Sequence, residues 1–208
     1  MQDPHNTSDP GGLSQGRLMH VVHNTGMVTG PKHFPVKTPA ARTASATGAA
    51  TQKATELMPG DVALGLAGDE MRTLLGSCVS VILTDPRRTV GAMCHIVHVG
   101  QPNAANQHNT AYGEVAMEDM FARLQSVGIP AQRCHAYVYG GGNMFPGIVS
   151  GPSVGDRNAQ WVMDFLHDHG IDVVEYSLGG TSYRKVSWTV GRTAPNVEDV
   201  SIEQGGFQ

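Results

Sequence analysis

Two residues of this chain have types and a setting that could support chemistry, Cys78 and His95. Cys78 follows the run Leu-Leu-Gly-Ser at the start of an apolar segment, and His95 lies in the next apolar segment, CHIVHV. A histidine beside a cysteine can take the thiol proton or lower the thiol pKa, which makes the cysteine a nucleophile. The competing interpretation is a buried small side chain and a buried histidine with a structural role. Which of them holds depends on how the two segments pair.

A hairpin between the two segments would bring both side chains onto one face of a sheet. Residues 85–88 read DPRR, with Asp and Pro at the positions where turns favour them. If these four residues form the loop, Cys78 lies opposite His95 and Ser80 lies opposite Met93. Opposite residues share a face and have Cβ atoms about 4.5–5.5 Å apart. A loop one residue longer would put His95 on the other face, so the residues alone leave both interpretations open.

The residues just before Cys78 add features that a nucleophile needs. Gly76 permits an unusual backbone turn and the close approach of a ligand. The backbone N–H groups around Ser77 and Cys78 could hold the negative charge that develops on an oxygen during attack. We therefore include Gly76 and Ser77 in the candidate site as its rim. Residues 140–142 are three consecutive glycines. This run lacks the Lys-Ser/Thr of a phosphate-binding loop and is interpreted as a turn.

The bulk composition excludes several classes of protein. The chain has 208 residues, which is enough for one domain with a real core, and its net charge of −4 does not favour binding to nucleic acid. No apolar run approaches the roughly 18 residues needed to cross a membrane, and the start of the chain has no signal-peptide pattern. The three cysteines, Cys78, Cys94 and Cys134, are an odd number without CxxC spacing. That pattern favours reduced thiols in the cytoplasm over a disulfide framework or a zinc site.

The composition changes twice along the chain, which predicts three regions. Residues 1–52 are dominated by Pro, Gly, Ser, Thr, Asn and Ala, and we expect them to be disordered because they carry too little apolar surface. Residues 53–195 have the patterning of a folded domain, and residues 196–208 have the composition of a polar tail. In the first region His20 and His23 lack a third ligand, so they do not indicate a metal site.

The folded region predicts a mixed α/β domain. Residues 114–128 and 158–169 have the pattern of amphipathic helices that end at a glycine. Strands are predicted over residues 89–99 and in further apolar segments before and after it. Trp161 and Trp188 are interpreted as core residues.

Two pairs of polar residues have structural interpretations. Arg157-Asn158, at the start of the second predicted helix, is interpreted as a cap with a solvated arginine. In Arg184-Lys185 we expect one side chain inside the strand pair and the other outside, because neighbours on a strand point to opposite faces.

Five blocks of sequence, in order, resemble the chemoreceptor glutamine deamidases of bacterial chemotaxis, the CheD family. The first block is LLGSCVSVILTDP followed by GAMCHIVHV, which holds Cys78 and His95. The others are YGEVAMEDMFARL, YVYGGGNMF, VGDRNAQWV and SLGGTSYRKVSWTVGR. The resemblance covers roughly residues 55–193, and the common order and spacing of the blocks make it specific.

The resemblance implies a fold and a reaction. The fold is a single mixed α/β (α+β) domain with a β-rich core flanked by helices, similar to CheD and to deamidating toxins such as cytotoxic necrotizing factor. The reaction is hydrolysis of particular glutamine side-chain amides on chemoreceptor helices to glutamate and ammonia, through a thioester and without a metal or organic cofactor. The implied catalytic residues are a Cys, a His and a Thr, and Cys78 and His95 match the first two.

The third catalytic residue departs from the family's pattern. Many members carry the Thr six residues before the Cys, where this chain has Arg72, whereas Thr73 lies five residues before Cys78. Either Thr73 takes the role through a local shift of the backbone, or the hydroxyl that orients the imidazole is missing.

The resemblance also implies partners and a rival function. The expected partners are cytoplasmic helices of chemoreceptors and, as in some members, a CheC-type phosphatase, and the protein itself is expected to be a monomer. A member that kept binding and lost turnover would be a docking module for receptors or for that phosphatase. A cysteine protease or a transglutaminase would use the same nucleophile and base, but the sequence has no feature of a peptide-bond cleft or an amine-acceptor site.

Overall fold

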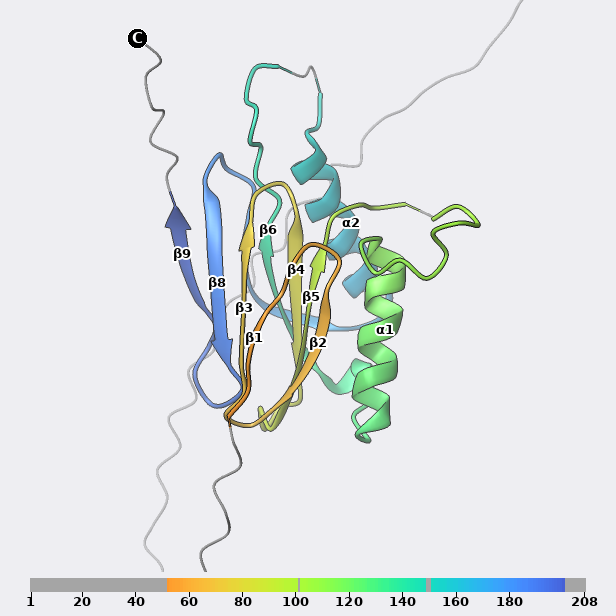
Figure 1. Cartoon of the computed structure of the whole chain (residues 1–208), viewed down its shortest axis with the longest axis vertical. Helices are drawn as coiled ribbons and strands as arrows, with labels where there is room; N and C mark the ends of the chain where they lie inside the picture. Colours follow the sequence, from red (N-terminus) through yellow and green to blue (C-terminus); the bar gives the residue numbers. More distant parts are fainter. Residues whose placement is uncertain (1–51, 101, 149–150, 201–208) are drawn as a thin grey trace, which may run out of the picture. The chain divides into compact units, whose positions relative to one another are not determined.

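The described part of the chain forms nine strands and two helices (Figure 1). The computed structural model describes residues 52–100, 102–148 and 151–200. The strands are β1 (Ala54–Glu56), β2 (Val62–Leu66), β3 (Glu70–Leu75), β4 (Val79–Thr84), β5 (Val90–Ile96), β6 (His135–Gly140), β7 (Asp172–Leu178), β8 (Tyr183–Thr189) and β9 (Asn196–Val200). The helices are α1 (Gly113–Ser126) and α2 (Val154–Asp168), and a 3-10 turn spans Ala131–Arg133.

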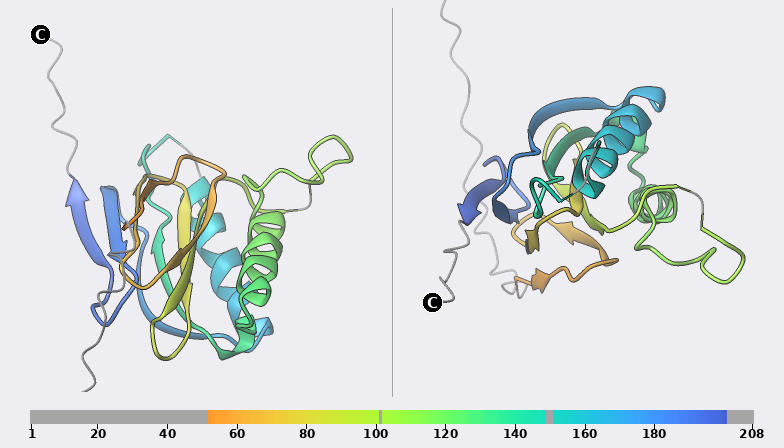
Figure 2. Two further views of the ribbon diagram at one scale, coloured as in Figure 1. Left: turned by 60° about the horizontal axis from the view of Figure 1, so that its bottom comes forward. Right: turned by 90° about the horizontal axis from the view of Figure 1, so that it is seen from above.

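These elements make three layers. A four-stranded sheet of order β1-β3-β8-β9 packs against a five-stranded sheet of order β2-β5-β4-β6-β7. Both helices cover the other face of the five-stranded sheet, as the two views of Figure 2 show. The prediction of a mixed α+β domain with a β-rich core flanked by helices is confirmed. Neither of the two helices in this part of the chain is long and apolar enough to cross a membrane.

Two apolar cores lie on the two faces of the five-stranded sheet. Successive strand residues point to opposite faces, so each central strand contributes to both cores. The core between the sheets includes Met71, Leu75, Ile82, Met93, Tyr137, Tyr139, Val186 and Trp188. The core under the helices includes Val79, Val81, Leu83, Ala92, Cys94, Ile96, Met117, Leu124 and Val162. Trp188 is buried as predicted, whereas Trp161 is partly exposed and packs against the core under the helices.

The hairpin of β4 and β5 has a longer loop than the sequence suggested. The register pairs Ser80 with His95, so the predicted pairs Cys78–His95 and Ser80–Met93 are wrong by two residues. The carboxylate of Asp85 explains the length of the loop, because it accepts three backbone N–H bonds within the loop at 3.1, 2.6 and 2.9 Å. Since the shift is two residues and not one, Cys78 and His95 still share a face. That face is the one between the two sheets.

The second predicted helix begins earlier than the sequence pattern suggested, at Val154. Its cap is Ser153, whose hydroxyl accepts from the N–H of Asp156, while the Asp156 carboxylate accepts from the N–H of Ser153. The interpretation of Arg157-Asn158 as the cap is therefore wrong. Asn158 lies inside the helix, on its buried side.

The end of the described chain adds a strand to the four-stranded sheet. Residues 196–200, which were expected to begin the tail, form β9 and pair with β8. Arg184 on β8 is buried and Lys185 is exposed, as predicted. The predicted disordered extension, apart from Gln52, lies outside the described residues, as do His20, His23 and the tail from residue 201 onward.

Candidate active site

The candidate site lies where β3 passes into β4, in the layer between the two sheets. Cys78 directly follows Gly76 and Ser77 in this passage and is partly buried. His95, on β5, is 3% exposed, and its ring reaches across the layer to Thr73 of β3, which is 1% exposed. The structure thus brings Thr73 into contact with His95 and places Cys78 on the same face of the five-stranded sheet as His95.

The hydrogen bonds of Thr73 determine which nitrogen of His95 carries a proton. The Oγ1 atom of Thr73 lies 2.8 Å from the carbonyl oxygen of Leu57 and 2.8 Å from Nδ1 of His95. A carbonyl can only accept, so the single hydroxyl hydrogen of Thr73 goes to Leu57. The hydroxyl oxygen must then accept from the Nδ1–H of His95. In neutral His95 the other nitrogen, Nε2, is therefore unprotonated and can act as a base.

The base nitrogen is free in the resting site. Nε2 of His95 is buried and has no hydrogen-bond partner, the thiol of Cys78 included, within the described residues. Burial lowers the pKa of His95, although the carbonyl of Leu57 and the charge of Asp61 oppose that shift. Burial likewise raises the pKa of Cys78. Both shifts favour the neutral forms of the thiol and of the imidazole.

Arg72 lies apart from the imidazole. Its guanidinium pairs with Glu70 at 3.0 Å and lies 3.9 Å from Glu56, and its side chain is 40% exposed. Because neighbouring strand residues point to opposite faces, Thr73 faces His95 and Arg72 does not. Of the two possibilities that the sequence left open, the structure has the Thr73 hydroxyl at the imidazole. Its catalytic role stays a prediction.

Backbone bonds from the glycine run at 140–142 hold the segment that carries Cys78. The N–H of Gly142 donates to the carbonyl of Gly76 at 2.8 Å, and the N–H of Gly141 donates to the carbonyl of Cys78 at 2.8 Å. Gly140 has a φ of +113°, and a Cβ atom there would lie 2.2 Å from the carbonyl oxygen of Cys78. Only glycine fits this position, so the run holds the backbone of Cys78 in place.

In the described residues, the backbone N–H groups of Ser77 and Cys78 take part in none of the hydrogen bonds of the fold. Neither has an acceptor within the described stretches of the chain. Donors in that state can hold an oxyanion, which is the role predicted for this rim. The site therefore combines a thiol, an imidazole with an assigned tautomer and two backbone N–H groups that have no acceptor in the described residues. Across residues 52–100, 102–148 and 151–200, no three His, Cys, Asp or Glu side chains are grouped to hold a metal ion.

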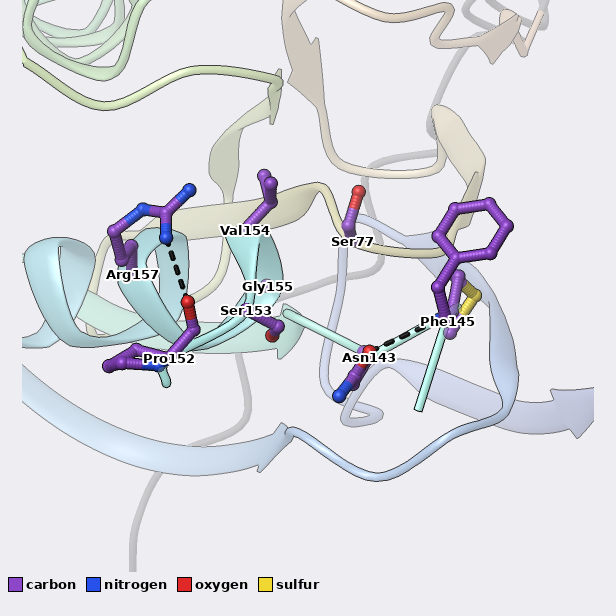
Figure 3. A pocket seen from close by; sticks show the side chains of 10 residues that line it. Ser77, Asn143, Phe145, Pro152, Ser153, Val154, Gly155 and Arg157 are labelled. Atoms are coloured by element: carbon purple, nitrogen blue, oxygen red, sulfur yellow. Dashed lines mark hydrogen bonds between the residues drawn. The ribbon is translucent and has the colours of Figure 1, made fainter. Parts of the chain in front are cut away.

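A hollow of about 160 Å³ opens beside Ser77. Figure 3 shows Ser77 between Val154, at the start of α2, and Phe145, in the loop after β6. Both apolar side chains are exposed, Val154 by 48% and Phe145 by 68%. At the far rim the guanidinium of Arg157 donates to the carbonyl of Pro152 at 2.8 Å. A mostly apolar hollow next to the residue before the nucleophile is suited to a side chain of a substrate.

Comparison with known proteins establishes the family. The chain is 39% identical over 138 residues to the probable chemoreceptor glutamine deamidase CheD 2 of Albidiferax ferrireducens, and the match covers 64% of this chain and 80% of that protein. The chain belongs to the CheD family. The probable chemoreceptor glutamine deamidase CheD of Rhodospirillum rubrum is 34% identical to it, over 73% of this chain and 87% of that protein.

Two other comparisons differ in what they cover. The family model described as CheD chemotactic sensory transduction matches residues 98–197, which include the glycine run and α2 but begin after Cys78 and His95. The crystal structure of a Neisseria meningitidis protein, assigned to the family model DUF152, aligns with a TM-score of 0.42 and 13% identity. That alignment covers 67% of this chain and 76% of the Neisseria protein.

Sequence reasoning missed three contributors to this CheD-family site. The carbonyl of Leu57 fixes the Thr73 hydroxyl, Gly155 packs on the glycine run, and Asn158 donates to the carbonyl of Ser77 at 3.0 Å. No sequence pattern reveals the carbonyl. A signal for the other two existed, because Gly155 and Asn158 occupy positions of the apolar stripe of α2, where a small or polar residue needs a reason.

Proposed function

We propose that this protein hydrolyses the side-chain amides of glutamines on chemoreceptors to glutamate and ammonia. The observation that carries the proposal is the chain of contacts from Leu57 through Thr73 to His95, which leaves Nε2 unprotonated on the face that Cys78 shares. The relatives are named probable chemoreceptor glutamine deamidases, and that name supplies the class of substrate.

In the proposed reaction Nε2 of His95 takes the thiol proton, and the sulfur of Cys78 attacks the glutamine Cδ. The N–H groups of Ser77 and Cys78 hold the oxygen of the tetrahedral intermediate. The imidazolium gives its proton to the departing ammonia, which leaves a thioester. Neutral His95 then takes a proton from water, whose oxygen attacks the thioester and releases glutamate, and the proton returns to the sulfur. Thr73 keeps Nδ1–H bound at each step, so the ring keeps its orientation.

The proposal extends to the substrate surface and the partners. A cytoplasmic helix of a receptor would lie over Ser77, with an apolar neighbour of the target glutamine in the hollow between Val154 and Phe145. A CheC-type phosphatase as a second partner rests on the resemblance of the sequence blocks. A cytoplasmic location rests on the pattern of the three cysteines, and we take the protein to act as a monomer. No metal or organic cofactor enters the proposed steps.

The alternative hypothesis, a docking module without turnover, is based on Arg72 at the position where many family members have the catalytic Thr. The Thr73 hydroxyl, 2.8 Å from Nδ1, supports an enzyme instead. Docking without turnover is kept as an outcome of the test.

The test is mass spectrometry of a cytoplasmic chemoreceptor fragment after incubation with the native protein or with Cys78→Ala. We expect the mass gain of amide-to-acid conversion at specific glutamines with the native protein only. A fragment that binds but keeps its mass would favour the docking module and overturn the enzyme. Chain cleavage or crosslinking of the fragment would point to a protease or a transglutaminase.

A further inference from the structure

A polar residue interrupts the buried stripe of α2. The helix buries Gly155, Asn158, Val162 and Leu166, which recur at the three- and four-residue spacing of one helix face. Asn158 is 1% exposed. An amide in such a place costs stability unless its hydrogens are bonded, so its partners should explain its presence.

The partners of Asn158 are two carbonyl groups from the two strands of the candidate site. Its Nδ2 atom donates to the carbonyl of Ser77 at 3.0 Å and to the carbonyl of Val97 at 3.1 Å. Ser77 directly precedes the nucleophile Cys78, and Val97 lies two residues after His95. One nitrogen therefore uses both of its hydrogens to join the segment of the nucleophile to the segment of the base.

The bridge stands where the sheet no longer joins these segments. The last paired residues of β4 and β5 at this end are Val79 and Ile96, so the ladder stops just before Cys78. Beyond that pair the strands need another link if the thiol and the imidazole are to keep a fixed separation. The Asn158 amide provides this link in place of the next hydrogen-bonded pair of the two strands.

We propose that Asn158 is a positioning residue that fixes Cys78 relative to His95. It touches neither the reacting atoms nor the substrate and acts through the backbone of Ser77 and Val97. This inference rests on the proposed function for its effect on turnover, but its effect on the Cys78 thiol does not depend on any substrate.

The variant Asn158→Asp separates this role from simple packing. It keeps the size of the side chain and replaces the bonded NH₂ group with an oxygen that faces two carbonyl oxygens. At neutral pH the ionised carboxylate would repel both carbonyls and release the two segments. Protonation of that carboxyl at lower pH restores one donor, so the defect relative to the native protein should shrink as the pH falls.

Two controls match the variant. Asn109→Asp makes the same chemical change in an exposed loop, where Asn109 Oδ1 accepts from the N–H of Ala111 at 2.9 Å, and a carboxylate keeps that bond. Val162→Ala weakens the packing of α2 on the same buried stripe without touching either carbonyl. The first reports the effect of an added charge and the second the effect of loosening the helix.

The first readout is the rate at which iodoacetamide alkylates Cys78, followed by mass spectrometry across pH, with buried Cys94 and Cys134 as internal references for unfolding. We expect Asn158→Asp to alkylate Cys78 several-fold more slowly than the native protein at pH 7.5 and to approach the native rate towards pH 5.5. Both controls should follow the native profile. A native profile for Asn158→Asp, or an equal slowing in Val162→Ala, would overturn the proposal.

The second readout is turnover of the chemoreceptor fragment. We expect kcat of Asn158→Asp to fall about 100-fold, as for a misplacement of about 1 Å, with KM little changed. A fall in kcat/KM carried by KM alone would overturn the positioning role. If the native protein deamidates nothing while the alkylation result holds, the proposed function fails and the role of Asn158 stands.

Discussion

Within the described residues, the hydroxyl of Thr73 assigns the tautomer of His95, and it can be removed on its own. Valine keeps the shape of threonine, so in Thr73→Val the Nδ1–H of His95 loses its acceptor and the carbonyl of Leu57 loses its donor. The neutral ring can then carry its proton on Nε2 instead of Nδ1, and Nε2 can no longer act as a base. We expect kcat for deamidation to fall about 100-fold, the lower end of what a positioned general base contributes.

The matched variant is Thr73→Ser, which keeps the hydroxyl and loses only a methyl group. It should retain most of the native kcat, because both hydrogen bonds of Thr73 can still form. A serine variant as slow as the valine variant would show that the packing of the methyl group, and not the hydroxyl, keeps the imidazole in place.

The pH dependence of the reaction should report the pKa of the buried His95 imidazole. Burial lowers the pKa of His95, and only the neutral ring can accept the thiol proton. The rate should therefore fall as the pH falls through this lowered pKa, so the acid limb of kcat/KM lies below the ordinary value of 6.5. The charge of Asp61 opposes the shift, so Asp61→Asn should move the limb to still lower pH.

The control for the pH profile is Asp164→Asn, which neutralises an exposed carboxylate on α2. It should leave the acid limb where the native protein has it, because Asp164 does not figure among the causes of the His95 shift. An acid limb at or above pH 6.5 in the native protein would contradict the buried neutral base.

Helix α2 and the glycine run touch through bare backbone, and this contact has a clear substitution test. A Cβ atom at Gly155 would lie 2.4 Å from the carbonyl oxygens of both Gly141 and Gly142. Alanine in a helix normally stabilises by about 0.5–1 kcal/mol relative to glycine. At Gly155 the clash with rigid backbone should outweigh this stabilisation. We expect Gly155→Ala to lower the free energy of unfolding by about 1–3 kcal/mol.

The same substitution should also slow turnover, because Gly141 and Gly142 hold the carbonyls of Cys78 and Gly76. Urea unfolding and the deamidation rate are measured on Gly155→Ala and on Gly191→Ala, whose new Cβ atom would meet nothing closer than 3.7 Å. Equal stability of the two variants would show that α2 moves away freely and that the contact does not set the nucleophile segment.

The elements also show what the sequence could predict. The hairpin predicted from the DPRR turn put Cys78 and His95 on one face although its register was wrong, because the face depends only on whether the loop has an even or odd number of residues. The register itself was missed, since it depends on the backbone bonds that the Asp85 carboxylate makes inside the loop. The start of α2 was missed because the pattern was read from its apolar residues and not from the Ser153 cap. The Asn158 bridge was missed because Asn158 lies 81 positions after Ser77 and 61 positions after Val97 in the sequence. No local sequence pattern contains contacts of that range.

Across the whole domain, the site depends on the packing of one sheet on the other. Thr73 belongs to the four-stranded sheet and His95 to the five-stranded sheet, so their 2.8 Å contact spans the layer between the sheets. The apolar core that fills this layer, with Met71, Ile82 and Trp188 among its members, sets the distance between the sheets. Core and catalysis are therefore coupled, since any loosening of this layer also frees the imidazole.

Global stability should respond to pH through a cysteine that the reaction does not use. Cys94 lies in the core under the helices, and burial raises its pKa to about 12, although a backbone bond with Val81 works the other way. In the unfolded chain the thiol ionises near its ordinary value of 9.0. Between these two values the unfolded state releases a proton that the folded state keeps. The stabilisation by the neutral thiol is thus complete below pH 9 and is lost as the pH rises, by about 1.4 kcal/mol per pH unit.

This loss can be measured by urea unfolding of the native protein and of Cys94→Ala between pH 8 and pH 10.5. The variant should be less stable at pH 8, because it leaves a cavity in a packed core. Its stability should nevertheless decline less steeply with pH, by the slope that corresponds to one proton, whereas groups present in both proteins, such as Cys134 with a pKa raised to about 11, cancel in the comparison. Two parallel declines would mean that Cys94 ionises in the folded protein as easily as in the unfolded chain, and that the core under the helices admits water at high pH.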